Sequence, residues 1–204
     1  MHLLDQRILG IGILFLLAGL VIVKQVSTGR ILDQPKGNLL VQLVNIFNLF
    51  FLLVVNPVAA LLMIARRIDA LDPTHVEIGP PWLLAAFEIL GLVAYVTGYV
   101  LMAWALIRLG RSYQLGGIAP RAEDSMVTDG PYGLIRHPMY TAALSISLGL
   151  ALLIHSWGFA CVFLIYLALI LSLIPLEEEG LRRAYGSLYG AYERRTRKLV
   201  PYAY

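Results

Sequence analysis

Five long runs of apolar residues constrain this chain more than any single motif does. As helices, runs of this length cross, or nearly cross, the ~30 Å hydrocarbon core of a bilayer. Of the 204 residues, 59% are hydrophobic and only 14% are charged, whereas a soluble domain has about 25% charged residues. The sequence therefore predicts an all-α integral membrane bundle of five transmembrane helices in a single domain, residues 1–204. The expected spans are about 8–26, 39–65, 82–107, 139–154 and 159–174.

The last two apolar runs are shorter than the others. Each has about 16 residues, against the roughly 20 that a helix needs to cross the core perpendicular to its plane. Only residues 155–158 separate the two runs, which predicts a short helical hairpin that either spans a thinned bilayer or nearly crosses it. In both cases the polar residues before and after the hairpin lie at the same face of the membrane.

Lysine and arginine are distributed unevenly over the predicted loops. Five spans put 13 of the 16 basic residues on one side and leave Arg7, Arg66 and Arg67 on the other. Basic loops stay in the cytoplasm. We therefore expect an N-terminus outside and a C-terminus in the cytoplasm, in the cell (inner) membrane. The loop at 108–138 and the tail from Glu177 then share the cytoplasmic face.

Composition excludes several other classes of function. The net charge is +3 and the pI is near 9.1, but the basic residues flank apolar runs, so we expect contact with anionic lipids and no nucleic-acid partner. Cys161 is the one cysteine, which excludes a disulfide within the chain and argues against a cysteine-based metal site. The sequence predicts no metal site. The first apolar run lacks a cleavage pattern, so we interpret it as a spanning helix rather than a signal peptide.

A few polar side chains interrupt the predicted spans. Gln42, Asn45 and Asn48 recur every three residues and share a helix face. We expect this face to point into the bundle, either to form interhelical hydrogen bonds or to line a substrate path. Glu88 is an intramembrane carboxylate near the outer interface, for which a functional role and snorkelling to the interface are both open.

The block Gly130–Ala142 concentrates polar groups at the start of the fourth span. Its Gly-Pro turn and the position of Pro138 place His137 at or near the N-cap of that helix. Free N–H groups at a helix N-terminus favour an anion, and Arg136 adds a bidentate donor for a carboxylate or phosphate. Tyr140 falls in the first turn. If the block only anchors the chain at the membrane surface, an arginine and an interfacial tyrosine are explained, but the turn, the histidine and the proline are not. A functional site explains all of them together.

A second polar block follows the fifth span. Glu177, Glu178 and Glu179 either begin a solvated helix with i,i+4 pairs to arginines or offer a carboxylate to ribose hydroxyls, an ammonium or a sulfonium. Aromatic residues that can form a stacking wall come next, followed by a basic cluster that can hold lipid phosphates. These residues are Tyr185, Tyr189, Tyr192, Arg194, Arg195, Arg197 and Lys198.

Taken in order, these residues resemble the isoprenylcysteine carboxyl methyltransferase family, which is related to phospholipid N-methyltransferases. The resemblance covers roughly Leu90–Pro201, and its motifs are specific in combination and weak singly. They are Trp104, Leu109-Gly110, Val127, Gly130-Pro131-Tyr132, Arg136-His137-Pro138, Tyr140, Glu177-Glu178, Tyr185-Gly186, Tyr189, Tyr192 and Pro201.

The resemblance implies an enzyme that transfers a methyl group from S-adenosylmethionine to a lipophilic acceptor that enters from the bilayer. The acceptor would be the carboxylate of a prenylated cysteine-like substrate. The cofactor would bind between the last spans, a cytoplasmic loop and a C-terminal helix, within about residues 108–204. By position, the cofactor-binding residues would be Tyr132, His137, Pro138, Tyr140, Glu178 and Tyr189, and the catalytic residues Arg136, Glu177 and Arg194.

The chemistry of the acceptor separates the alternatives. A carboxylate is already a nucleophile at pH 7 and needs only an orienting cation such as Arg136. A phospholipid amine would need a general base, a role open to Glu177 or His137. Two other classes are an NADPH-dependent reductase of sterol-like lipids, which shares the Arg-His-Pro-x-Tyr block, and a non-catalytic membrane protein.

Overall fold

The computed structural model describes residues 2–29, 39–113 and 125–201. Within these ranges the regular elements are helices, and β-type pairing is limited to two isolated bridges. The α-helices are α1 Gln6–Thr28, α2 Leu39–Phe50, α3 Asn56–Ile64, α4 Ile68–Leu71, α5 Pro81–Leu109, α6 Pro138–Ile154, α7 Trp157–Tyr185 and α8 Ser187–Arg195. A π-helical turn, Phe51–Val55, joins α2 to α3, and 3-10 turns lie at Gly110–Ser112 and Gly130–Gly133.

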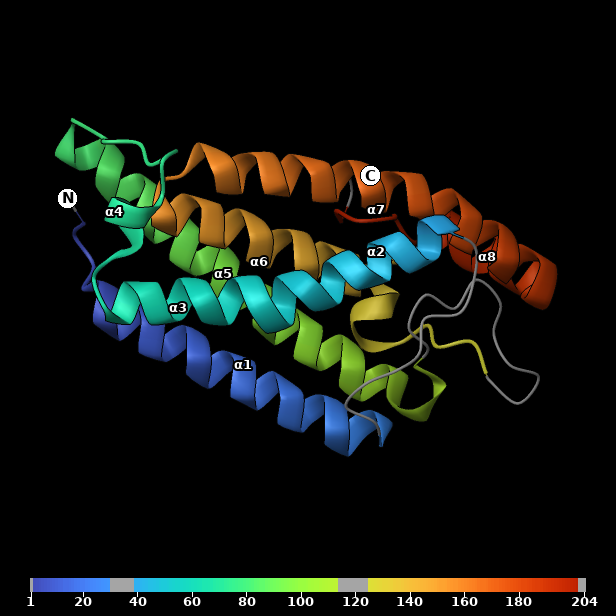
Figure 1. The fold of residues 1–204 in the computed structure, drawn as a ribbon. Coiled ribbons are helices and arrows are strands. Elements are labelled where there is room, and N and C mark those ends of the chain that lie inside the picture. Colours follow the sequence, from blue (N-terminus) through green and yellow to red (C-terminus); the bar gives the residue numbers. More distant parts are fainter. Residues whose placement is uncertain (1, 30–38, 114–124, 202–204) are drawn as a thin grey trace.

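The long helices run side by side along one axis, with the N-terminus and α4 at one end and α8 at the other (Figure 1). Helix α5 packs mainly against α6, while α1 packs against α3 and α5, and α6 against α7. By length and composition, four described stretches can cross a membrane: α1, the joined α2–α3, α5 and α7. Helix α6 is apolar but has only 17 residues. The prediction of an all-α, multi-pass membrane protein is confirmed.

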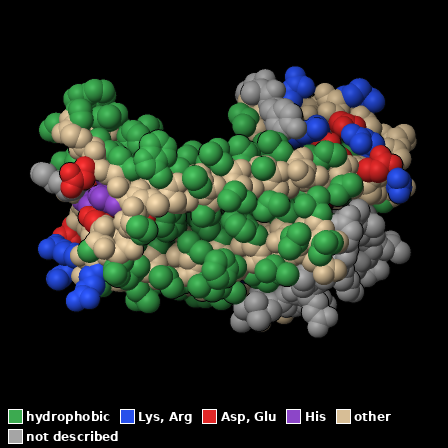
Figure 2. Space-filling model, turned by 45° about the horizontal axis from the view of Figure 1, so that its top comes forward, with side chains coloured by type: hydrophobic (Ala, Val, Ile, Leu, Met, Phe, Trp, Pro, Cys, Tyr) green, Lys and Arg blue, Asp and Glu red, His purple; other side chains and the backbone are tan. Residues whose placement is uncertain are grey.

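The surface of the molecule fits a membrane environment. On the face that Figure 2 shows, hydrophobic side chains cover the middle of the bundle, and acidic and basic side chains gather at its two ends. Large apolar side chains such as Phe15 and Ile8 are 77% and 72% exposed. An exposed apolar surface of this extent fits contact with the lipid of a membrane.

The helix that contains the fifth predicted span extends beyond that span. The span was expected to end at residue 174, but α7 continues through Pro175 to Tyr185. Glutamate and arginine are good helix formers, and ion pairs join Arg182 to Glu178 and Arg183 to Glu179 one turn apart. The apolar part of α7 ends at Leu176, so its last turns extend beyond the apolar span and carry the second polar block.

Small residues let α5 and α6 approach closely. A Cβ atom added to Gly149 of α6 would lie 2.6 Å from the backbone nitrogen of Tyr95 and 2.7 Å from the carbonyl oxygen of Gly91, both in α5. At Gly98 the added atom would lie 2.9 Å from the Ala142 carbonyl oxygen. These contacts involve backbone atoms, so the helices themselves would have to separate.

Replacing Gly149 with alanine is expected to destabilise the bundle by about 1–3 kcal/mol, because the added methyl group overpacks the α5–α6 interface. Gly12→Ala in α1 is the matched control, since a Cβ there meets no atom within 4 Å. Unfolding in detergent, followed by circular dichroism, measures both changes. Equal stability of the two variants would contradict the packing described for this interface.

The polar residues of the spans have different environments. Asn45 is buried and Asn48 is partly buried, but Gln42 is exposed, so the prediction of one inward face is wrong for Gln42. The three positions span too wide an arc of the α2 surface to face one neighbour. Glu88 is 1% exposed and accepts backbone hydrogen bonds from Leu3 and Leu4. It therefore binds the N-terminal segment rather than snorkelling.

Candidate active site

The two polar blocks meet at the end of the bundle that carries α8 (Figure 1). The segment after α8 runs beside the residues that lead into α6. The Arg136 and His137 amides donate to the carbonyl oxygens of Arg197 and Lys198 at 2.7 and 3.0 Å, and the Thr141 hydroxyl donates to the Leu199 carbonyl oxygen at 2.7 Å. The tail thereby holds the first block in place against α7.

His137 is the N-cap residue of α6, as predicted, and Pro138 occupies the first turn. Proline fits there because it has no N–H to leave unsatisfied. The side chain of His137 does not cap the helix. It is turned towards α7, where its Nε2 lies 3.3 Å from Glu178 Oε1 and its Nδ1 lies 3.7 Å from Glu177 Oε2.

Glu178 is the buried anchor of the site, with a side chain only 2% exposed. The Arg136 Nε donates to its Oε1 at 2.8 Å, and Arg182 and Lys198 lie 3.6 and 3.7 Å from its Oε2. Burial by itself would raise the pKa of this carboxyl, but hydrogen bonds from His137 and Arg136 outweigh burial and lower the pKa to about 2. Glu178 is therefore a carboxylate at neutral pH.

Arg136 connects this anchor to the end of α8. Its Nη1 donates to the carbonyl oxygens of Glu193 and Thr196 at 3.1 and 2.5 Å, and its side chain is 6% exposed. A guanidinium at the C-terminal carbonyls of a helix satisfies orphan acceptors and complements the helix dipole. Because three of its donor contacts are to protein groups, Arg136 holds the site together, and only part of it faces the cavity.

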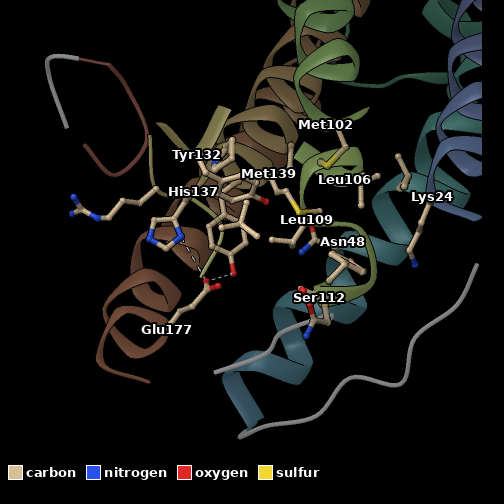
Figure 3. A pocket seen from close by; sticks show the side chains of 18 of the residues that line it. Lys24, Asn48, Met102, Leu106, Leu109, Ser112, Tyr132, His137, Met139 and Glu177 are labelled. Carbon is tan, nitrogen blue, oxygen red and sulfur yellow. Dashed lines mark hydrogen bonds and ion pairs between the residues drawn. The ribbon is translucent and has the colours of Figure 1, made fainter. Parts of the chain in front are cut away.

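Glu177, one residue earlier, faces the cavity. The Tyr140 hydroxyl donates to its Oε2 at 2.7 Å, and the Glu177 side chain is 26% exposed. The rings of Tyr140 and His137 stack with centroids 5.5 Å apart. Figure 3 shows His137 and Glu177 at one side of the pocket, with dashed lines converging on the carboxylate. This wall of the cavity is therefore acidic and aromatic.

The cavity has a volume of about 300 Å³ and joins this polar wall to an apolar one. Met102 and Leu106 of α5 lie across from His137 and Glu177 in Figure 3. In α8, Tyr189 and Tyr192 also line it. Burial raises the pKa of Tyr192 to about 12, and its hydroxyl donates to the Tyr132 carbonyl oxygen at 2.7 Å.

Two buried polar atoms at the cavity lack a hydrogen-bond partner among the described residues: Asn45 Nδ2 and Tyr189 Oη. Both side chains are nearly inaccessible, at 3% and 1% exposed. A buried polar group without a partner costs about 1–3 kcal/mol. These two groups point to a ligand with polar atoms along its length.

Most of the predicted site residues converge on this cavity. It is lined by Tyr132, Arg136, His137, Pro138, Tyr140, Glu177 and Tyr189. Glu178 lies behind this wall, and Arg194 is exposed on α8 away from the lining. Sequence reasoning missed Lys24, Met102 and Ser112, which also line the cavity. In the sequence, these three residues look like residues at or near the ends of spans that face lipid.

Comparisons with known proteins address the same part of the chain. A family model described as phospholipid methyltransferase matches residues 87–187. Protein-S-isoprenylcysteine O-methyltransferase B of Arabidopsis thaliana is 32% identical over 126 residues, which are 59% of this chain and 61% of that protein. Cobalt-zinc-cadmium resistance protein CzcN of Cupriavidus metallidurans is 33% identical over 98 residues, 48% of this chain and 45% of that protein. The chain thus spans less than two thirds of the length of these relatives.

A solved structure shares the fold. It is that of the eukaryotic intramembrane Ras methyltransferase, isoprenylcysteine carboxyl methyltransferase, which matches with a TM-score of 0.54 at 20% identity. The match covers 79% of this chain and 74% of that chain, and so includes helices outside the region of the family model. The chain is therefore similar in sequence to known methyltransferases over about half of its length, and it shares the fold of the solved isoprenylcysteine carboxyl methyltransferase.

Proposed function

We propose that this protein is an S-adenosylmethionine-dependent methyltransferase that acts on the carboxylate of a prenylated cysteine-like substrate. The observation that carries the proposal is the cavity, in which a polar wall of His137, Tyr140 and Glu177 continues into an apolar wall between α1, α2 and α5. A methyl donor and a lipophilic acceptor need these two environments side by side. The relatives named above add the substrate class.

The residues of the cavity fit the cofactor. The Glu177 carboxylate offers an anion to a sulfonium or ammonium group, and the unpaired atoms of Tyr189 and Asn45 offer hydrogen bonds to polar groups further along the ligand. When bound, S-adenosylmethionine supplies a methyl group on a positively charged sulfur, which a nucleophile takes by in-line displacement. The chain's residues then need only to hold donor and acceptor in line and to exclude water.

The acceptor requires little further chemistry. A cysteine carboxylate is ionised at pH 7, so no residue has to remove a proton before it attacks the methyl carbon. Methyl transfer would form a bond between the carboxylate oxygen and the methyl carbon and would break the carbon–sulfur bond of the donor, whose bonding pair would stay on sulfur. Among the residues that the structure describes, Lys24 and the cavity-facing part of Arg136 are the cations in the lining, and they would orient the carboxylate. Arg194, which is exposed on α8, would contribute from outside the lining.

The membrane orientation belongs to the same proposal. The cavity lies at the end of the bundle where the described part of the chain has Arg182, Arg194 and Lys198. This basic end would face the cytoplasm. S-adenosylmethionine made by soluble metabolism would then reach the cavity from water, while the acceptor enters from lipid.

Ligand-dependent stabilisation of the detergent-purified protein tests the cofactor assignment. We expect S-adenosylhomocysteine to raise the melting temperature and NADPH to leave it unchanged, because binding to the folded state stabilises it by mass action. Stabilisation by NADPH alone would favour a reductase. No response to either ligand would remove the support for a catalytic role of this cavity.

Tyr189→Phe separates ligand binding from folding. Removing an unpaired buried hydroxyl should leave the unfolding free energy unchanged or slightly higher, but should weaken S-adenosylhomocysteine binding about 10-fold if this hydroxyl bonds the ligand. Tyr192→Phe is the matched control, because that hydroxyl bonds the Tyr132 carbonyl oxygen and its loss should lower stability by about 1 kcal/mol. Calorimetric titration and thermal unfolding give both quantities. Unchanged affinity in Tyr189→Phe would place the ligand elsewhere.

A phospholipid amine is the second candidate acceptor. The family model carries that substrate class in its description, and the Tyr140–Glu177 pair could accept a proton from an amine. Transfer of a radiolabelled methyl group distinguishes the two products. A carboxyl methyl ester is cleaved by base, whereas an N-methyl group is not.

A further inference from the structure

Three of the chain's four histidines lie together at the end of the bundle opposite the cavity. They are His2 before α1, His75 after α4 and His155 at the end of α6. Two acidic residues, Asp69 of α4 and Glu88 of α5, share this end with them. Figure 2 shows histidine beside acidic side chains there. The five residues come from four separate parts of the chain, since Asp69 and His75 are near neighbours, so their meeting is a property of the fold.

The contacts within this histidine cluster are close. His2 Nδ1 lies 3.1 Å from Glu88 Oε1, and the ring of His2 stacks on that of His155 with centroids 4.8 Å apart. The ligand atoms offered by His2, Glu88 and His155 all lie within 4.8 Å of one another. Glu88 and His155 are 1% and 4% exposed. Three groups able to ligate a metal therefore converge in a place from which water is largely excluded.

One of these groups lacks a partner. Nε2 of His155 is buried and forms no hydrogen bond within residues 2–29, 39–113 and 125–201. The backbone around it is fixed, because the His155 carbonyl oxygen accepts from the Val76 amide at 2.7 Å. A buried imidazole nitrogen without a partner is costly, and a metal ion would satisfy it. This observation separates the cluster from an ordinary network of hydrogen bonds.

From this geometry we propose that His2, Glu88 and His155 form a binding site for a divalent transition metal such as Zn²⁺. Two histidines and one glutamate are a known ligand set for zinc with an open fourth position. Zinc–nitrogen and zinc–oxygen bonds of about 2.0–2.1 Å place tetrahedral ligand atoms roughly 3.4 Å apart. His2 Nδ1 and Glu88 Oε1, which are 3.1 Å apart, already have about this spacing. Because all three ligand atoms lie within 4.8 Å of one another, the remaining ligand would have to move by at most about 1.4 Å.

The surroundings of the cluster support the assignment. Asp69 Oδ1 lies 3.0 Å from His2 Nε2, so this carboxylate can hold the ring while Nδ1 ligates. A carboxylate behind a ligating histidine is the usual outer partner in metal sites. The two carboxylates together balance the charge of a dication. The Asp69 side chain is 36% exposed and that of His75 is 14% exposed, which gives an ion a route in from solvent.

Metal binding by the full chain, purified in detergent without a histidine tag and stripped with a chelator, tests the proposal. The wild type should bind one equivalent of Zn²⁺ and should give visible absorption bands with one equivalent of Co²⁺. His155→Asn and Glu88→Gln should each lower the affinity at least 100-fold, and Asp69→Asn should lower it about 10- to 100-fold. Asparagine is chosen at position 155 because the backbone there has a φ of 56°, which asparagine tolerates.

Two controls keep the result specific. Glu77→Gln removes an exposed carboxylate near this end, and His137→Gln removes the one histidine outside the cluster; both should bind zinc like the wild type. Circular dichroism of each variant establishes that it is folded. The proposal would be overturned if the wild type failed to bind one equivalent of Zn²⁺, or if His155→Asn still bound it. The histidine cluster would then be a hydrogen-bonded network that joins the N-terminal segment to the bundle. The outcome is independent of methyl transfer, since the two sites lie at opposite ends of the bundle.

Discussion

Glu178→Gln is expected to lower the free energy of unfolding by about 3 kcal/mol, because the buried Arg136 guanidinium loses its close carboxylate partner and keeps only the more distant Glu193 carboxylate, at 3.9 Å, among the described residues. The Arg136 and Glu178 side chains are 6% and 2% exposed, and their shortest contact is 2.8 Å. Without that contact, Arg136 would also hold the end of α8 less firmly. Chemical or thermal unfolding in detergent should show the loss directly.

The neighbouring glutamate provides the control for this substitution. The Glu179 side chain is 49% exposed and pairs with Arg183 at 2.9 Å, so Glu179→Gln should change stability by less than about 1 kcal/mol. A value for Glu178→Gln within that same margin would contradict the role of Glu178 as an anchor.

The contribution of Glu178 to the free energy of unfolding should depend on pH. Its folded-state pKa is lowered to about 2 from an ordinary value of 4.5. The stabilisation is therefore fully present above about pH 4.5 and is lost as the pH falls towards 2. Wild type and Glu178→Gln should thus converge in stability at the acid end of a pH series, and a constant difference between them would contradict this linkage.

Glu177→Gln should have the opposite profile: it should lower kcat/KM for methyl transfer about 100-fold, equivalent to roughly 2.7 kcal/mol, while leaving folding nearly intact. The amide keeps an oxygen for the Tyr140 hydroxyl, which now bonds the carboxylate at 2.7 Å, but it removes the negative charge from the cavity wall. The proposed cationic methyl donor would lose its counter-charge. Steady-state kinetics and S-adenosylhomocysteine titration measure the two effects.

Glu179→Gln again serves as the control, since Glu179 is not part of the cavity lining and its carboxylate pairs with Arg183. Unaltered activity and affinity in Glu177→Gln would mean that the charge at this position has no part in binding the donor. In that case Glu177, Glu178 and Glu179 would differ in how deeply they are buried but not in whether they bind the donor. A stability loss at Glu178 together with a binding loss at Glu177 would establish two distinct roles within one helical turn.

The sequence predicted where the individual site residues lie in their helices better than it predicted which of these residues contact one another. His137 as N-cap and Pro138 in the first turn follow from local rules that depend on a few neighbouring residues. Which of three adjacent glutamates would be buried depends on the angle at which α7 passes Arg136, and that angle follows from packing of the whole bundle. The pattern of charges alone therefore left Glu177 and Glu178 interchangeable.

The apolar wall and the histidine cluster could not be predicted for a related reason. A methionine or leucine in a span has the same sequence signature whether it faces lipid or a cavity. His2, Glu88 and His155 are far apart in the chain and have none of the short spacings that mark a metal motif. The continuation of α7 beyond residue 174 was missed because hydropathy ends where the polar helix begins.

Transfer of a radiolabelled methyl group from S-adenosylmethionine to a prenylated cysteine with a free carboxylate tests the central claim most directly. With purified wild-type protein in lipid, we predict a base-labile methyl ester that forms at a rate lowered about 100-fold by Glu177→Gln and unchanged by Glu179→Gln. Absence of labelled product from both the prenylated cysteine and the surrounding phospholipid, with folded protein, would contradict the account.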